Sequence, residues 1–401
     1  MKVLAIQPFL KGYGLHPVAG GKDKAALEIS RVLVEMGAQL DVLALPWGVE
    51  GRNSEWMAQE QMCLLSPDGL QARVLETVSL PDAREAGRLL WRFLTSRGCV
   101  RRPYVVARDL VWRCMVDKRR SIRKALEKSR PDLLLVHQTG SDVVPIAREA
   151  GFRGPAVLVH HSTGASSFAG AYERVVFVSA HQREELVRRV PSLKSRSEVI
   201  RYFASDEYFA ACDPGPKPAI VFIGILDTKR KGLDLILDAY DACPELGSVT
   251  LHVVGEGPLR ELHERRAAEG GHPVRFHGRI GHAGNAQLMA GAGAYVMPSR
   301  GEGLALVYLE ALCMGVPIIG YAPNVEELGL VLEEDVGDPF QADRESPRLL
   351  AERILQLTSP SSRISVQARR RLAERARESF STDSFHAAWR RFFTATEREL
   401  T

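Results

Sequence analysis

The sequence contains few cysteines, and their positions argue against two common uses of this residue. Six occur among 401 residues, at positions 63, 99, 114, 212, 243 and 313. No two of them lie at the spacing of metal ligands, and the pattern does not suggest a disulfide framework. We therefore expect a protein of the reducing cytoplasm that holds no metal through its cysteines.

Long apolar runs are lacking too. No stretch approaches the roughly 18 apolar residues of a membrane span, and the apolar stretch after Met1 stops at Pro8, too early for a signal peptide. An excess of one charge is also missing, because 53 basic and 49 acidic residues leave a net charge of +4. The sequence therefore predicts a cytoplasmic protein that binds no nucleic acid and at most lies peripherally on the inner face of a membrane.

What the chain does contain is two series of strand-length apolar runs that alternate with helical segments. Two domains are expected for 401 residues, because a single core seldom grows that large. Apolar runs without alternation are typical of parallel strands covered on both faces. The predicted strands of the first half are Val3–Ile6, Leu40–Leu45, Leu133–Val136, Ala156–Val159 and Val175–Val178. Those of the second half are Ala219–Ile223, Val249–Val254, Val274–Phe276, Ala294–Met297 and Val316–Ile319.

Helical segments and turn residues complete an α/β pattern. Asp23–Met36 is predicted as a helix that ends at Gly37, which suits a C-cap. Further helical stretches are predicted at Gly232–Ala242, Leu304–Met314 and Arg363–Glu399. Asp213–Pro218 makes a stiff, turn-rich linker. We predict two facing Rossmann-like domains, 1–212 and 213–380, and a helix over 381–401 that packs back on the first. Ligands are expected in the cleft, at the carboxyl ends of the strands.

The strongest motif follows the predicted strand Ala294–Met297. A glycine-bearing loop leads there into a helix, whose first N–H groups form an anion site suited to a diphosphate. The residues expected at this site are Gly303, Leu304, Ala305 and Leu306. Glu302 lies in the loop, and Glu310 lies eight positions further along. A carboxylate at the second position accepts hydrogen bonds from two neighbouring hydroxyls, as acidic residues do with ribose in Rossmann sites.

With two glutamates separated by seven residues in this setting, the chain resembles glycosyltransferase family 4 over nearly its whole length. The resemblance implies a GT-B fold and retention at the anomeric carbon. It also implies that Glu302 lies by the donor sugar and that Glu310 binds the nucleotide ribose. A charged loop beside a partly exposed helix is the alternative. Ala305 stands where the family usually has glycine, and we expect only a small adjustment of the phosphate site.

A second motif follows the predicted strand Ala219–Ile223. Gly224 comes directly after it, and Arg230 and Lys231 lie a few residues further along. A cation at this edge would neutralise a leaving diphosphate. The family carries a lysine–glycine pair that maps to Lys231 and the residue after it. Its arginine after the strand glycine is replaced by Ile225, and Arg230 is expected to take over that charge. A solvated basic turn is the alternative for Arg230.

Further positions gain meaning from the resemblance. Gly20 and Gly21 follow the first strand, where a Gly-Gly pair of the family faces the donor phosphates. A histidine that matches His160 lies beside the donor sugar in the family, although a lone histidine is more often structural; the family often has aspartate at His161. Gly255 is expected to approach the nucleotide closely.

A basic segment with interleaved aromatic residues lies in the first half. Twelve Lys or Arg and three Asp or Glu occur from Arg97 to Arg130. This pattern suits an anionic membrane surface, but it also suits a phosphorylated acceptor or a solvated helix. These alternatives stay open from the sequence.

The residues and the resemblance together predict a retaining hexosyltransferase. Its first domain would bind the acceptor and its second a UDP- or GDP-type donor sugar. The acceptor would be a glycan, glycolipid or small molecule, in the synthesis of cell-surface polysaccharide, lipopolysaccharide or glycoconjugate. No cofactor or metal is expected, because the sequence has no Asp-x-Asp, a metal-clamping motif of another glycosyltransferase class. A non-catalytic binding module is an alternative, since an arginine and an Asn-Gly of the family are missing. A sugar-nucleotide epimerase or hydrolase is another.

Overall fold

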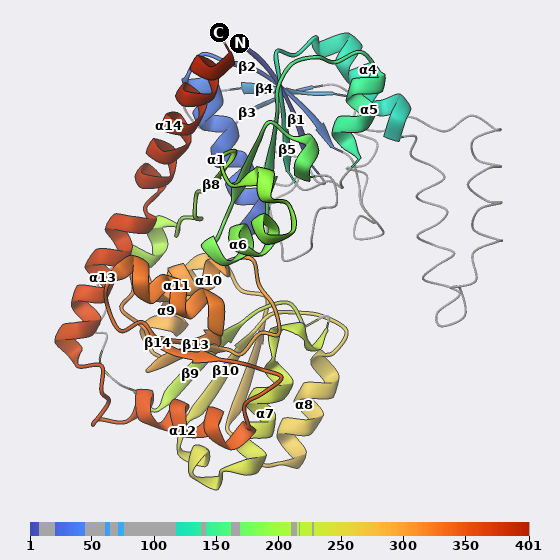
Figure 1. The fold of residues 1–401 in the computed structure, drawn as a ribbon. Helices are drawn as coiled ribbons and strands as arrows, with labels where there is room; N and C mark the ends of the chain where they lie inside the picture. The colour runs from blue at the N-terminus through green and yellow to red at the C-terminus, as the bar shows by residue number, and fades with distance from the viewer. Residues whose placement is uncertain are drawn as a thin grey trace, which may run out of the picture. The chain divides into compact units, whose positions relative to one another are not determined.

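The computed structural model describes residues 1–7, 21–44, 61–64, 71–75, 118–137, 142–161, 169–209, 215, 217–226 and 228–400. The chain divides into two compact units (Figure 1). Unit 1 comprises Met1–Phe177, Arg183–Ile200 and His386–Thr401. Unit 2 comprises Val178–Gln182 and Arg201–Phe385. Each unit is built around one sheet of mainly parallel strands.

The sheet of unit 1 has eight strands, of which only β3 runs antiparallel to its neighbour. In spatial order they are β3 (Gln61–Leu64), β4 (Gln71–Val74), β2 (Gln39–Ala44), β1 (Lys2–Gln7), β5 (Leu133–His137), β6 (Ala156–His160), β7 (Arg174–Phe177) and β8 (Ser197–Val199). The described helices of this part are α1 (Gly21–Glu35), α4 (Lys118–Ser129), α5 (Val143–Glu149), α6 (Ala180–Arg189) and α14 (Thr382–Leu400). The order of connection reverses between β1 and β5, which makes their carboxyl ends a topological switch point.

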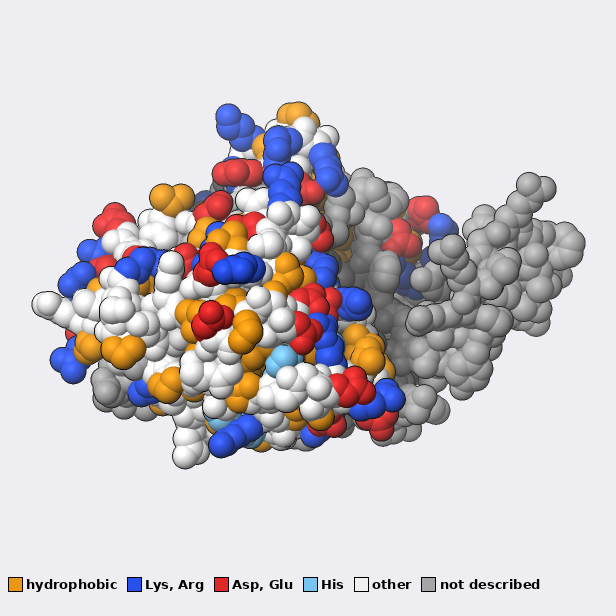
Figure 2. All heavy atoms as spheres, turned by 90° about the horizontal axis from the view of Figure 1, so that it is seen from below, with side chains coloured by type: hydrophobic (Ala, Val, Ile, Leu, Met, Phe, Trp, Pro, Cys, Tyr) orange, Lys and Arg blue, Asp and Glu red, His pale blue; other side chains and the backbone are white. Residues whose placement is uncertain are grey.

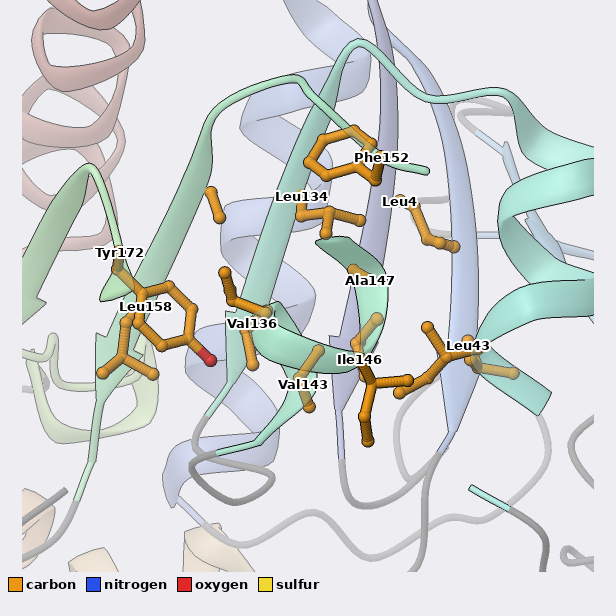
Figure 3. Packing of buried hydrophobic residues seen from close by; sticks show 14 of the residues in the cluster. Leu4, Leu43, Leu134, Val136, Val143, Ile146, Ala147, Phe152, Leu158 and Tyr172 are labelled. Carbon is orange, nitrogen blue, oxygen red and sulfur yellow. The ribbon is translucent and has the colours of Figure 1, made fainter. Parts of the chain in front are cut away.

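Apolar side chains cover this sheet on both faces. On one face, Leu4, Leu134 and Val136 pack with Val143 and Ile146 of α5 (Figure 3). Their strand neighbours are as deeply buried and point to the other face, because successive strand residues alternate. Burial on both faces explains why these strands are apolar without alternation.

Helix α14 covers part of unit 1 from His386 onward. His386 Nε2 lies 2.8 Å from a carboxylate oxygen of Glu28 in α1. The aromatic rings of Trp389 and Phe392 are buried, and the guanidinium of Arg174 lies 5.3 Å from the centre of the Phe392 ring. The last helix of the chain is therefore part of the N-terminal core.

The sheet of unit 2 has six strands, all parallel. In spatial order they are β11 (Val274–Gly278), β10 (Thr250–Val254), β9 (Ala219–Ile223), β12 (Ala294–Met297), β13 (Ile318–Tyr321) and β14 (Gly337–Phe340). Its helices among the described residues are α7 (Leu233–Ala242), α8 (Arg260–Glu269), α9 (His282–Ala290), α10 (Leu306–Cys313), α11 (Ala322–Leu332), α12 (Pro347–Thr358) and α13 (Val366–Phe380). The order 3-2-1-4-5-6 puts the switch point between β9 and β12.

The predicted strands are all present, but the helical stretch predicted over Arg363–Glu399 is two helices, α13 and α14. Ser381 separates them with an extended backbone (φ −70°, ψ 158°). Its hydroxyl oxygen accepts a hydrogen bond from the N–H of Ser384 at 3.1 Å. A serine that caps the next helix in this way satisfies a free N–H group and ends the preceding helix.

Candidate active site

Two loops meet at the switch point of unit 2. The turn 228–232 follows β9, and the loop 298–303 follows β12. The backbone of Gly232 is left-handed (φ 82°), and a Cβ atom there would lie 2.3 Å from the carbonyl oxygen of Pro298. Only glycine allows this approach. The glycine after Lys231 therefore has a structural role: it lets the basic turn pack against the loop that carries Glu302.

Glu302 is the centre of a charged cluster between these loops. Only 7% of the residue is exposed. Its Oε1 atom lies 2.8 Å from the ammonium nitrogen of Lys231 and 2.9 Å from a guanidinium nitrogen of Arg230. Oε1 also lies 2.6 Å from the hydroxyl of Ser299. Charge-assisted hydrogen bonds of this kind are short and strong, so the carboxylate has a fixed orientation.

The two cations of this cluster differ in their exposure. The side chain of Lys231 is 17% exposed and that of Arg230 is 50% exposed. Lys231 can therefore act on an anion in a shielded place, where its charge has a larger effect. Arg230 can reach an anion from the solvent side. The structure thus brings together three residues that the sequence singled out, and adds Ser299, which carried no motif signal.

Helix α10 begins at Leu306, two residues later than predicted. Ala305 has an extended backbone (φ −76°, ψ 115°), so Leu304 and Ala305 belong to the loop. The first N–H groups of a helix have no acceptor within it, and here they belong to Leu306 and Val307. The expected anion site therefore starts at Leu306, with Gly303 to Ala305 leading into it.

Glu310 is buried in α10, with 3% exposure, and its neighbour is Tyr208. Burial raises the pKa of the Tyr208 hydroxyl, and the nearby negative charge of Glu310 raises it further. The hydroxyl of Tyr208 also lies 3.3 Å from Nδ1 of His282. Because the tyrosine stays protonated, it is available as a donor beside the Glu310 carboxylate. Sequence reasoning missed Tyr208, which lies 102 positions before Glu310 and in no motif.

Gly224 and Gly255 lie at the same edge of the sheet. The Gly255 backbone has φ 143°, and a Cβ atom there would lie 1.8 Å from the carbonyl oxygen of Gly224. The N–H of Gly224 donates to the carbonyl of Val254 at 3.0 Å. The close approach that requires Gly255 in this structure is thus between two backbone segments after β9 and β10.

Two polar side chains of α11 support the site and an adjacent helix. The amide of Asn324 donates to the carbonyl of Gly303 at 2.9 Å, which fixes the loop after Glu302. The carboxylate of Glu327 accepts from the N–H of Ala180 at 2.8 Å and from Arg201 at 2.8 Å. An acidic residue at the start of a helix is favoured by the helix dipole. Glu327 therefore has a structural role at the start of α6.

Three histidines gather at the carboxyl edge of the unit 1 sheet. His137 ends β5, His160 ends β6, and His161 follows it; all three are buried. Nδ1 of His137 lies 3.1 Å from Nε2 of His161, and their rings are stacked at an interplanar angle of 14°. Burial lowers the pKa of His137 to about 3. His137 is therefore neutral at physiological pH. Sequence reasoning read it only as the end of an apolar strand.

Other predicted positions of unit 1 are only partly within the described residues. Gly20 lies outside them, and Gly21 is the first residue of α1. Of the basic segment, only the part from Lys118 is described, and it forms α4 up to Ser129. No helix in the described ranges is apolar enough over a sufficient length to cross a membrane.

A family model matches part of this chain. Residues 217–359 match the model described as "Glycosyl transferases group 1". The matched residues cover the part of unit 2 that holds Lys231, Glu302 and Glu310.

Curated relatives agree with this family. A phosphatidyl-myo-inositol mannosyltransferase of Mycobacterium leprae is 33% identical over 102 residues, which cover 25% of this chain and 27% of that protein. The enzyme of the same name from Mycobacterium tuberculosis is 24% identical over 241 residues, covering 56% of this chain and 63% of that protein. The chain thus spans less than two thirds of the length of these relatives.

Solved structures share the fold of the whole chain. HepE of Anabaena in complex with UDP has a TM-score of 0.65 at 16% identity, with 98% of this chain and 100% of that chain covered. Sucrose-phosphate synthase from Thermosynechococcus elongatus has a TM-score of 0.64 at 17% identity, with the same coverage. These likenesses show a shared two-domain α/β fold.

Proposed function

We propose that this chain, which has the two-domain α/β fold of the GT-B glycosyltransferases and a group 1 glycosyl transferase match over residues 217–359, is a retaining glycosyltransferase. It transfers a sugar from a UDP- or GDP-type donor to a hydroxyl of a glycan, glycolipid or small-molecule acceptor. Unit 2 binds the donor, and unit 1 binds the acceptor. The product belongs to a cell-surface polysaccharide, a lipopolysaccharide or another glycoconjugate.

The meeting of Lys231, Arg230 and Glu302 at the switch point of unit 2 carries this proposal. Two cations within 2.9 Å of one carboxylate oxygen form a fixed charged cluster in the place where open α/β sheets bind ligands. A diphosphate carries the negative charge that such cations attract. Since protein cations supply the positive charge, we propose that the reaction needs no metal ion.

Each residue has a part in the proposed reaction. Lys231, Arg230 and the N–H groups at the start of α10 hold the diphosphate and stabilise it as it leaves. Glu310 binds the ribose hydroxyls, and Glu302 accepts a hydrogen bond from the donor sugar. The leaving phosphate takes the proton of the acceptor hydroxyl, so that the new glycosidic bond forms on the face from which the phosphate departs. His160 remains a proposed catalytic residue of unit 1.

Thermal melting with UDP, GDP, ADP and CMP, each without added metal and with a chelator, tests the donor site first. A ligand at a hundred times its dissociation constant stabilises by about 2.7 kcal/mol. For a protein of this size, this corresponds to a rise of roughly 2–4 °C. We expect a shift with one nucleoside diphosphate. If none shifts the melting point, even with magnesium, the donor site is refuted.

A transfer assay separates this proposal from two other functions. An epimerase or hydrolase would consume the donor sugar without any acceptor. A non-catalytic binding module would bind the nucleotide and transfer nothing to a broad panel of acceptors. A product whose anomeric configuration, measured by proton NMR, equals that of the donor supports retention, and an inverted product contradicts it.

We further propose that α4 contacts an anionic membrane surface. Arg120, Arg123 and Lys124 are exposed on the side of this helix opposite the buried Ile122 and Ala125. On the face drawn in Figure 2, by contrast, acidic and basic side chains of the described residues lie interspersed, which does not favour a nucleic acid. Vesicle sedimentation with increasing anionic lipid is the test, and binding that ignores the anionic lipid content refutes this part.

A further inference from the structure

Arg300, two positions before Glu302, is engaged in an ion pair with α7. Its guanidinium makes two parallel hydrogen bonds with the carboxylate of Asp234, from Nη1 to Oδ1 at 3.0 Å and from Nη2 to Oδ2 at 2.9 Å. The side chains are 28% and 10% exposed, so water screens this pair only partly. A bidentate arginine–carboxylate pair fixes geometry in two directions, which a single surface ion pair does not.

Arg300 also holds the basic turn through backbone groups. Its N–H donates to the carbonyl of Arg230 at 2.8 Å, and its guanidinium donates to the carbonyl of Lys229. The hydroxyl of Ser299 lies 2.9 Å from the same Arg230 carbonyl. One residue therefore binds two consecutive peptide groups of the turn and, at the same time, the helix that follows it. Lys231 lies between these two attachments.

We propose that Arg300 and Asp234 are positioning residues, whose ion pair holds the turn of Arg230 and Lys231 against the loop of Glu302. This inference rests on the proposed function, because the turn is the part of the donor site that meets the diphosphate. Neither Arg300 nor Asp234 needs to touch the donor. Their effect passes through the position of Lys231, and a shift of about 1 Å in a reacting group can cost a hundredfold in rate.

The test compares Arg300→Leu with Arg353→Leu in the full chain. Arg353 forms an ion pair with Glu345 at 2.6 Å, also partly buried at 18% and 20% exposure, and it belongs to α12 in the same unit. The control thus removes a comparable ion pair away from the two loops. Hydrogen–deuterium exchange is measured for the peptides that contain residues 228–232 and 298–303, and the dissociation constant of UDP and of GDP is measured by calorimetry.

We expect Arg300→Leu to raise exchange in both peptides at least fivefold and to weaken the bound nucleoside diphosphate about tenfold. Arg353→Leu changes neither. Asp234→Asn should also raise exchange and weaken nucleotide binding, but by less. The double variant of Arg300 and Asp234 should show the same exchange and affinity as Arg300→Leu alone, because the two residues act as one unit. A donor KM that rises more than kcat falls would agree with looser phosphate binding.

The two readouts separate this inference from the proposed function. Exchange that rises in Arg300→Leu supports the positioning role, whether or not wild type binds a nucleotide. Wild-type protein that binds neither UDP nor GDP refutes the donor site and, with it, the functional part of the inference. If wild type and Arg300→Leu bind the nucleotide equally and their exchange matches that of Arg353→Leu, the ion pair is only structural and the inference is wrong.

Discussion

In unit 1, the strand after the reversal of order, β5, ends in His137, whereas in unit 2 the corresponding strand, β12, leads into Glu302. Apart from the antiparallel edge strand β3 of unit 1, the parallel strands of both sheets follow the same order up to this point. Both switch points lie at carboxyl ends of strands. Yet His137 is buried and neutral, with its pKa lowered to about 3 by burial. Glu302 is buried too, but one of its carboxylate oxygens forms ion pairs with both Lys231 and Arg230.

This difference shows which part of a site the fold decides and which part the side chains decide. The topology fixes where a ligand meets each sheet, because the loops that follow the strands diverge at the switch point and leave room for a ligand there. The side chains fix what kind of ligand is held. Neutral imidazoles both donate and accept hydrogen bonds, which suits hydroxyl groups. Paired cations at a helix start suit a diphosphate. In the proposed function, the two units therefore serve different halves of one transfer reaction.

The largest effect is expected from Lys231→Met, which removes the shielded cation from the unit 2 edge. A hydrogen bond to a charged group contributes about 1.5–3 kcal/mol, so nucleoside diphosphate affinity should fall by roughly 100-fold, or about 2.7 kcal/mol. Calorimetric titration measures this. Lys229→Met is the matched control, because Lys229 is an exposed lysine of the same turn. Equal losses in both variants would mean that net charge alone attracts the nucleotide.

Next in size is Glu310→Ala, for which we expect roughly 30-fold weaker nucleotide binding, or about 2 kcal/mol, since the carboxylate accepts hydrogen bonds from the ribose. Glu302→Ala should instead lower turnover and leave the nucleotide affinity almost unchanged. Steady-state kinetics together with calorimetry separates the two. Glu326→Ala serves as the control, because Glu326 is an exposed glutamate of α11 in the same unit. Similar changes of affinity and turnover in both glutamate variants would contradict the assigned roles.

The contrast between the two units was only half visible in the sequence. The unit 2 edge carries spaced motifs, so Glu302, Lys231 and Glu310 could be singled out before their geometry was known. The residues that hold these three in place could not be singled out from the sequence. Arg300 and Asp234 are 66 positions apart and form an ion pair, and nothing local to either residue indicates the other. At the unit 1 edge, His137 reads as the end of an apolar run, and only the fold places it beside His161.

The strands show the same limit. Those in the middle of each sheet are apolar on both faces, and they were predicted because burial requires this composition. Strands β3, β4, β8 and β14 were not predicted, and β3, β8 and β14 lie at sheet edges. Gly337–Phe340 contains an aspartate and a proline, and β3 and β4 contain glutamine. At a sheet edge, pairing with one neighbour through backbone groups suffices, and the composition of the strand carries little signal.

A third test asks whether the stability of unit 1 depends on His137 being neutral. Its folded pKa of about 3 lies below the ordinary value of 6.5, so the unfolded chain binds a proton first as the pH falls. The stability from this neutral residue is complete above pH 6.5 and decreases between pH 6.5 and 3. At pH 5 the loss is about 2 kcal/mol, from 1.5 units at roughly 1.36 kcal/mol each.

Urea unfolding at pH 7 and pH 5, followed by tryptophan fluorescence, measures this loss, since all five tryptophans belong to unit 1. His137→Asn should reduce the difference between the two pH values by about 2 kcal/mol, even if it lowers stability at both. His277→Asn changes a histidine of β11 in unit 2, so it should leave the difference that the unit 1 tryptophans report unchanged. An unaltered pH dependence in His137→Asn would show that protonation of this residue does not limit the stability of unit 1.

The smallest effect is expected from a substitution that adds a positive charge to the unit 2 edge, where Ile225 stands. Ile225 follows Gly224 at the switch point and is 59% exposed. Ile225→Arg should strengthen nucleoside diphosphate binding about fivefold, or about 1 kcal/mol, the upper end for an exposed ion pair. The gain should disappear in 1 M salt, where charges are screened beyond about 3 Å. Ile225→Gln keeps a long polar side chain without charge, and we expect no gain from it. If glutamine strengthens binding as much as arginine does, the apolar surface of Ile225, rather than a missing cation, is what limits the affinity of this edge for the diphosphate.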